Sequence, residues 1–184
     1  MSSTPLFGGA LSLPLPPSFH DVSALREVPD HQEVFAEGGA QGASLILEVV
    51  EAQADLADAV AAHFFWADLA SCNGAREGAW RALHPPPAPL PLGGDPRCAA
   101  VVAGVGAQLP DGGGAPVCVA LAALRLPSMG SELLLSVNVP SGGGGGAGAA
   151  EARAEALLLA ALPELRVHDW GLFCAGEGGG ALEE

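Results

Sequence analysis

Runs of aliphatic residues along the chain predict a sheet of about six strands. The clearest runs are 43–51, 98–108, 117–126 and 132–139, and the weaker runs 6–17 and 33–37 complete the set. In the last of the clear runs, Leu133, Leu135 and Val137 fall on one face of an extended chain. Because short links join the three runs between 98 and 139, we expect these strands to be antiparallel.

Two longer segments have the pattern of helices. Residues 55–69 place apolar side chains at helical spacing, with Asp55 as a candidate N-cap. Residues 150–162 are rich in alanine and leucine and end before Pro163. Because the helices fall between groups of strands, the expected fold class is α+β, with layered helices and sheet. The stripe expected to face the core of the first helix is Leu56, Val60, Phe64 and Ala67.

The chain length of 184 residues favours one domain. We expect this domain to span 1–174, with a proline-rich loop at 85–91 and a glycine-rich loop at 141–148. Residues 175–184 are predicted to be an acidic, disordered tail. The stretch 71–97 has no clear pattern of secondary structure. Residues 6–17 are interrupted by prolines, which predicts a single edge strand, and residues 21–26 predict a short helical turn.

The charge of the chain excludes several classes of partner. It has seven arginines, no lysine and 21 acidic residues, for a net charge of −14. Phosphate groups of nucleic acids and of anionic lipids are bound by basic clusters, so we expect neither nucleic acid nor a membrane as partner. No apolar run approaches the ~20 residues of a spanning helix, and no secretory signal or transit peptide is visible at the start. A charged partner should be basic.

The four cysteines are Cys72, Cys98, Cys118 and Cys174. None forms a CxxC pair, and four in a chain of this length do not make a disulfide framework. We therefore expect reduced thiols, mostly in the core, as in a cytosolic or nuclear protein.

Motifs of catalysis and cofactor binding are missing from the sequence. There is no GxSxG, no HExxH and no GxxxxGK[ST], and the five histidines lack the spacing of a zinc site. We predict no catalytic residue, no cofactor and no metal. An undetected hydrolase or metalloprotein remains an alternative hypothesis.

One segment, 21–37, is dense in charge. It holds five acids and Arg26, a net charge of −4. Asp30 and Glu33 follow Pro29, so their carboxylates should be held on a rigid loop that enters a strand. Two interpretations are open at this point: a solvated face with local capping, or an acidic recognition patch for a basic surface.

The same segment resembles a known family. The run Val28–Phe35 (VPDHQEVF), together with Pro5–Ala10, Ser44–Glu51, Glu132–Ser136 and His168–Asp169, is similar to the Ran guanine nucleotide release factor family. These are small nuclear proteins that bind the GTPase Ran and promote release of its nucleotide. The family usually has a polar or acidic residue where this chain has Ala67.

The resemblance implies an α/β/α sandwich around a largely antiparallel sheet, as in the PsbP proteins of photosystems. It implies that Asp30 and Glu33 contact Ran, and it makes the adjoining residues further candidates. It also implies a monomer of the nucleus and cytoplasm that regulates nucleocytoplasmic transport without catalytic chemistry of its own. The alternative is a PsbP-like structural module associated with a photosystem and without Ran binding. The adjoining candidates are Arg26, Glu27, His31 and Gln32.

Overall fold

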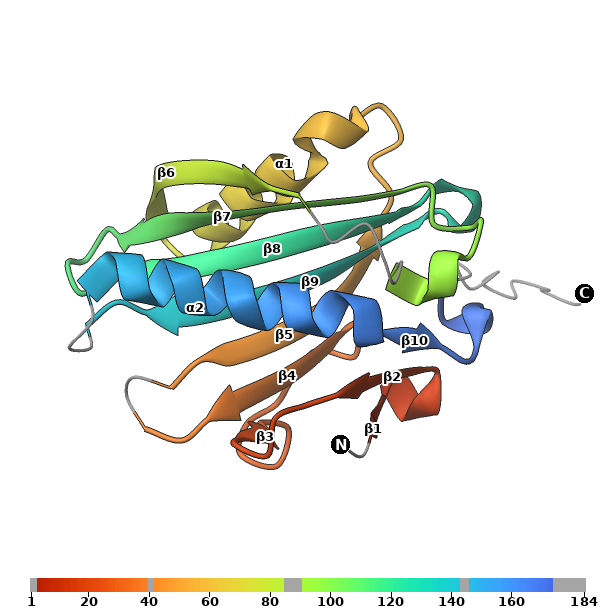
Figure 1. The fold of residues 1–184 in the computed structure, drawn as a ribbon, viewed down its shortest axis with the longest axis horizontal. Coiled ribbons are helices and arrows are strands. Elements are labelled where there is room, and N and C mark those ends of the chain that lie inside the picture. The colour runs from red at the N-terminus through yellow and green to blue at the C-terminus, as the bar shows by residue number, and fades with distance from the viewer. Residues whose placement is uncertain (1–2, 40–41, 85–90, 143–145, 174–184) are drawn as a thin grey trace, which may run out of the picture.

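An antiparallel sheet of seven strands forms the centre of the protein (Figure 1). The computed structural model describes residues 3–39, 42–84, 91–142 and 146–173. The strands are β3 (Phe19–Asp21), β4 (Gln32–Glu37), β5 (Ser44–Glu51), β6 (Ala75–Leu83), β7 (Ala100–Pro110), β8 (Val117–Leu126) and β9 (Ser131–Pro140). Their order in the sheet is β3-β4-β5-β9-β8-β7-β6, and every pairing is antiparallel.

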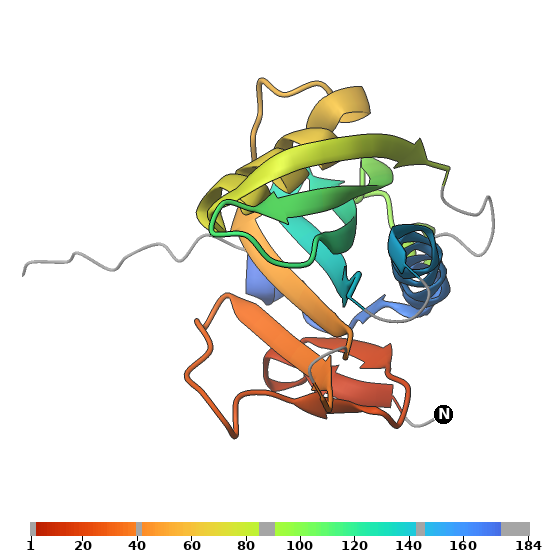
Figure 2. The same ribbon diagram turned by 90° about the vertical axis from the view of Figure 1, so that its left-hand side faces the viewer.

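Two helices cover opposite faces of this sheet, α1 (Asp58–Cys72) and α2 (Gly146–Ala161), as Figure 2 shows. The alternation of β8 accounts for both layers. Leu121 and its neighbours at odd positions pack with α1, whereas Leu124 and its neighbours at even positions pack with α2. The α+β sandwich predicted from the sequence is therefore confirmed. Neither helix of the described residues is long and apolar enough to cross a membrane.

A second, small sheet contains β1 (Ser3–Leu6), β2 (Leu11–Pro14) and β10 (Arg166–Val167) in the order β1-β2-β10. The sequence predicted one edge strand over 6–17, which is wrong, because the 3-10 turn η1 (Phe7–Gly9) folds the chain back into a hairpin. Gly8 and Gly9 adopt positive φ values of 65° and 96°, which glycine does at little cost. The hairpin buries Leu11 and Leu13 completely in the main core.

The predicted apolar stripe of the first helix is wrong. Val60 and Phe64 are 50% and 44% exposed. The helix begins at Asp58 without a side-chain cap, so Asp55 does not cap it. Apolar residues occur on more than one face of this helix, so periodicity could not choose between the face of Phe64 and the face of Trp66. The buried face consists of Ala61, Ala62, Phe65, Trp66 and Ala70.

Strand β6 lies in the stretch 71–97, where the sequence pattern predicted nothing. It is an edge strand of the sheet, with a register shift between Glu77 and Trp80. Its charged side chains and its bulge conceal the period of two. The main sheet therefore contains two strands that the sequence did not predict, β3 and β6, whereas the strand expected over 6–17 belongs to the small sheet.

The remaining sequence predictions concern the loops. Helix α2 begins at Gly146, so the last three residues of the predicted glycine loop 141–148 are helical. The short strand β10 and the 3-10 helix η5 (Trp170–Phe173) lie at the end of the described chain. Residues 85–90 and the acidic tail 175–184 lie outside the described residues, so the domain limits of 1–174 stay a prediction.

Gly104 in β7 provides a test of this packing. A Cβ atom at Gly104 would lie 2.0 Å from the Trp80 ring, which in turn lies 5.0 Å from the Trp66 ring. We expect Gly104→Ala to displace Trp80 and to lower the free energy of unfolding by about 1–3 kcal/mol. Urea denaturation followed by tryptophan fluorescence measures this. Gly112→Ala is the control, because a Cβ there meets nothing within 4 Å; equal stability losses in the two variants would contradict the packing.

Candidate partner-binding surface

The loop between β3 and β4 carries the acidic segment and is held by local hydrogen bonds. The amides of Leu25 and Arg26 donate to the Val22 carbonyl, which makes the single helical turn that the sequence predicted. Further on, the Gln32 amide donates to the Pro29 carbonyl at 2.9 Å. Two consecutive turns therefore fix the backbone on both sides of Asp30 as it enters β4.

The six candidate residues do not form one cluster. Asp30, Gln32 and Glu33 line a shallow depression together with Phe7 and other residues of the N-terminal hairpin. The side chains of Arg26, Glu27 and His31 are exposed and lie outside its lining. The predicted site thus divides into a depression and a charged rim.

Strand alternation separates two neighbouring candidates further. Glu33 turns toward the hairpin, where its Oε1 accepts a hydrogen bond from the Phe7 amide. Gln32 turns to the α1 face, where its Nε2 donates to Glu48 Oε1 at 2.9 Å. His31 Nε2 lies 3.4 Å from the same Glu48 oxygen. Glu33 therefore also has a structural role, and Gln32 belongs to a second surface.

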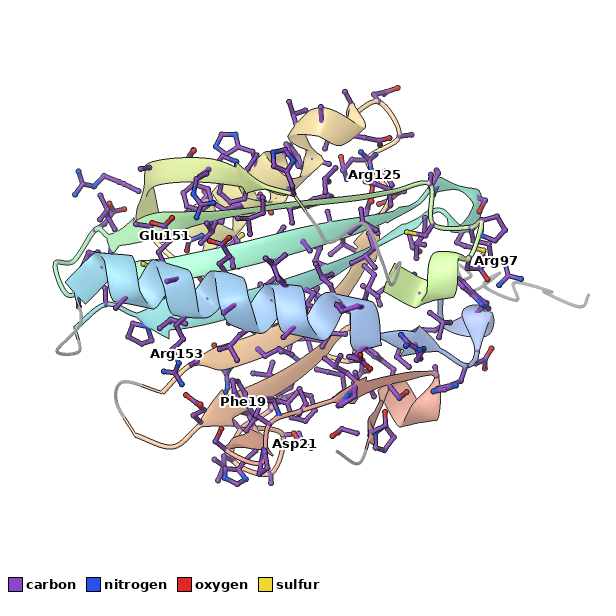
Figure 3. All side chains as sticks on the ribbon, viewed as in Figure 1. Phe19, Asp21, Arg97, Arg125, Glu151 and Arg153 are labelled. Carbon is purple, nitrogen blue, oxygen red and sulfur yellow. The ribbon has the colours of Figure 1, made fainter. Side chains whose placement is uncertain are left out.

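The acids of the segment differ in their availability to a partner. Glu37 is engaged inside the protein, by Arg153 Nη2 at 2.6 Å and by the Ala43 amide at 2.9 Å (Figure 3 labels Arg153). Burial opposes its ionisation, but these contacts outweigh burial, so the pKa of Glu37 lies below its ordinary value. Among the described residues, by contrast, no hydrogen bond or ion pair reaches the exposed carboxylates of Glu27 and Asp30. Asp30 is thus the acid of the depression that is most available.

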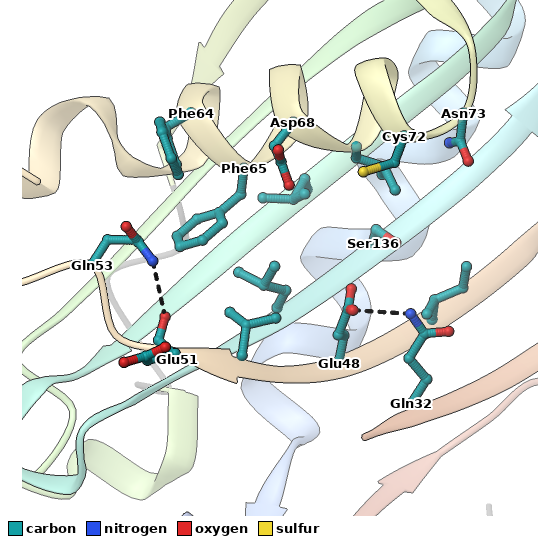
Figure 4. Close-up of a pocket in the computed structure, with 15 residues that line it drawn as sticks. Gln32, Glu48, Glu51, Gln53, Phe64, Phe65, Asp68, Cys72, Asn73 and Ser136 are labelled. Carbon is teal, nitrogen blue, oxygen red and sulfur yellow. Dashed lines mark hydrogen bonds between the residues drawn. The ribbon is translucent and has the colours of Figure 1, made fainter. Parts of the chain in front are cut away.

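A groove of about 470 Å³ lies on the other side of Gln32, between α1 and β5 (Figure 4). Its floor is apolar, with Ile46, Val50 and Phe65 among its residues, and Phe64 stands on its helix side. Its acidic residues are Glu48, Glu51 and Asp68. Sequence reasoning did not find this groove, because its residues come from separate strands and one helix and share no motif.

The fold and the surface permit comparison with known proteins. The family model described as "Ran-interacting Mog1 protein" matches residues 4–140 of this chain. The chain belongs to the Mog1 family. The matched region includes the whole acidic segment and all of the groove residues.

Relatives of this Mog1-family chain carry consistent names. The Ran guanine nucleotide release factor of Danio rerio is 36% identical over 143 residues, which cover 75% of this chain and 78% of that protein. The Homo sapiens protein of the same name is 38% identical and covers 74% of each chain. The crystal structure of the Saccharomyces cerevisiae Ran-binding protein Mog1p superimposes with a TM-score of 0.72 at 25% identity, covering 94% of this chain and 98% of that one. The resemblance inferred from the sequence is therefore confirmed.

Thiols and metal ligands add no chemistry to this Mog1-family surface. Burial raises the pKa of the Cys98 thiol to about 11, and it also raises the pKa of Cys118. Both are free thiols, as is the exposed Cys72. Within the described ranges, no three His, Cys, Asp or Glu side chains come together as a metal site. That no metal or cofactor is needed stays a prediction.

A buried ion pair positions the loop at one end of the groove (Figure 3 labels Arg125). Arg125 Nε lies 2.8 Å from Glu132 Oε1, and these side chains are 6% and 1% exposed. The same arginine donates to the carbonyls of Gln53 and Leu56, at 2.9 and 3.0 Å. The pair therefore ties the segment between β5 and α1 to β8 and β9. Burial raises the pKa of Glu132, although Arg125 opposes the shift.

Replacing Arg125 by methionine tests this arrangement. The variant Arg125→Met leaves the Glu132 carboxylate buried without its partner, and we expect a loss of about 3–5 kcal/mol of unfolding free energy at pH 7. Without the arginine, the pKa of Glu132 rises further above its unfolded value. Because the penalty belongs to the ionised form, it shrinks as the pH falls through that folded pKa. Urea denaturation at a series of pH values measures both effects.

The double variant Arg125→Met with Glu132→Gln is the control, because it has no carboxylate to titrate at this position. A stability loss in Arg125→Met that has the same pH dependence as in the double variant would contradict the role of the buried charge.

Proposed function

We propose that this protein binds Ran and promotes release of its guanine nucleotide, and that it acts in nuclear import. The observation that carries the proposal is the family match over 4–140, together with relatives that are named Ran guanine nucleotide release factor and nuclear import protein MOG1. Family membership favours this function over the alternative of a photosystem-associated module. The same reasoning makes the protein a regulator and not a catalyst.

A release factor shifts the nucleotide equilibrium of its GTPase through differential binding. It must bind the nucleotide-free form more tightly than the loaded form, since equal affinity for both shifts nothing. GTPases hold their nucleotide with a P-loop lysine and a magnesium ion. We infer that acids of this protein engage a basic residue of Ran near that site and weaken these contacts.

Among these acids, Asp30 is the best candidate for the contact with a basic residue of Ran. It is exposed, its backbone is held by the two turns of the loop, and its carboxylate has no partner within the described part of the chain. Glu27 and Arg26 lie beside it on the same loop. Glu33 adds negative charge to the depression, although its bond to the Phe7 amide occupies one oxygen. Their field attracts a basic surface and favours fast association.

The contacts of the arginines disfavour nucleic acid and anionic membranes as partners. Six of the seven arginine side chains contact carboxylates or carbonyls of this protein, and among the described residues nothing of this kind contacts the Arg26 side chain. Little cationic surface is left for nucleic acid or an anionic membrane. We propose a monomeric domain over 1–174 that works in the nucleus and the cytoplasm.

Charge reversal at Asp30 tests the function. We expect Asp30→Lys to weaken Ran binding by about tenfold or more, mainly through slower association, because a favourable charge pair becomes a repulsive one. Release of a fluorescent guanine nucleotide from Ran, followed by stopped flow, should slow in proportion. Salt should weaken the parent complex more than the variant complex.

Two further variants make this result specific. Glu164→Lys makes the same change of charge at an exposed residue beside α2, and it should bind Ran as the parent does. Glu33→Gln keeps an oxygen that can accept from the Phe7 amide while it removes the charge. If a folded Asp30→Lys protein binds Ran with the parental affinity and promotes nucleotide release from Ran at the parental rate, the proposed site is refuted. A parent protein that does not bind Ran in any nucleotide state would refute the function itself.

A further inference from the structure

We propose that the groove between α1 and β5 is a second contact for Ran, and that it takes a segment in which a lysine or arginine stands next to a large apolar side chain. This inference rests on the proposed function and extends it beyond the acidic loop. The apolar floor, the negative charge of the groove and the shared lining residue Gln32 each support it.

The groove has an apolar side that solvent reaches. Phe64 is 44% exposed and lines both the groove and an adjoining depression formed by the segment that follows β5. Phe65 and Leu69 continue this surface along the helix. Covering such a surface with an apolar side chain is favourable, because it removes apolar area from water. The geometry thus accommodates one large apolar residue of a partner.

The negative charge of the groove favours a cationic group supplied by a binding partner. Glu48, Glu51 and Asp68 line it, and no arginine does. The arginines that make ion pairs contact acids outside the groove; Arg153, for example, pairs with Glu37. The imidazole of His31, at the mouth, is the one potentially cationic group of the described residues that contacts any of the three, through Glu48. A second copy of this chain, with its net charge of −14, would be repelled.

The groove is continuous with the surface around Asp30. Gln32 lines both cavities, and its side chain joins them through the hydrogen bond to Glu48. A protein that covers Asp30 therefore lies next to Gln32, which also lines the groove. This continuity makes Ran the expected occupant, in preference to an unrelated ligand.

Two substitutions in the groove test the contact. Phe64→Ser removes the exposed ring and Asp68→Asn removes one charge, and both residues are exposed on α1, so the fold should tolerate them. We expect the double variant to bind Ran at least about fivefold more weakly, since both parts of the contact are lost. Calorimetry or surface plasmon resonance with nucleotide-free Ran measures the affinity.

The matched control is Val60→Ser combined with Glu164→Gln. Val60 lies one turn before Phe64 on the same helix and is 50% exposed, but it does not line the groove. The control makes the same kinds of change and should stay within about twofold of the parental affinity. Circular dichroism and urea denaturation verify that all variants are folded.

Cys72 supplies an independent readout, because its exposed thiol lies at the end of the groove. We expect bound Ran to slow maleimide labelling of Cys72, which mass spectrometry of the labelled peptide distinguishes from the other cysteines. Protection of Cys72 that depends on protein concentration without Ran would identify a second copy as the occupant and would overturn the proposal.

The outcomes separate this inference from the function on which it rests. If Asp30→Lys loses affinity while the groove variant retains it, the groove contact is refuted and Ran binding stands. If the parent does not bind Ran, the proposed function fails and this inference fails with it. Loss of affinity in the groove variant, with the control unaffected and Cys72 protected, supports the contact.

Discussion

The fold depends on one pair of buried charges where the central strands β8 and β9 meet their connecting turn. Arg125 and Glu132 face each other on β8 and β9. The arginine also donates hydrogen bonds to carbonyls of the segment that leads into α1. Removal of two charges from water costs several kcal/mol, so the attraction within the pair adds little net stability. Its main effect is to position the segments that it joins. Here it fixes where α1 lies against the sheet, and thereby the width of the groove.

Much of the fold could be predicted from the sequence, because strong patterns act locally. The central strands have runs of aliphatic residues, and β5, β8 and β9 lie where those runs predict them. Strand β6 could not be found, since an edge strand with a bulge has no clear period. The buried face of α1 could not be found either, because apolar residues occur on more than one face of the helix and only tertiary packing selects between Phe64 and Trp66.

The site could be predicted only as a motif. The run from Val28 to Phe35 supplied most of the candidate residues, which the sequence treats as one unit. In the structure, the period of two in β4 sends Gln32 and Glu33 to opposite faces, where they bond to Glu48 and to the Phe7 amide. The groove shares no motif with this run, and only the pairing of β4 with β5 brings the two together.

The bond between Glu33 and the Phe7 amide has a consequence for the cost of association. It joins the acidic loop to the N-terminal hairpin, and the turns at Val22 and Pro29 hold the rest of the loop. A loop that is ordered before it meets a partner gives up little conformational entropy on binding. In the proposed complex, the interaction energy of the carboxylates would therefore serve discrimination between the states of the partner more than ordering of the loop.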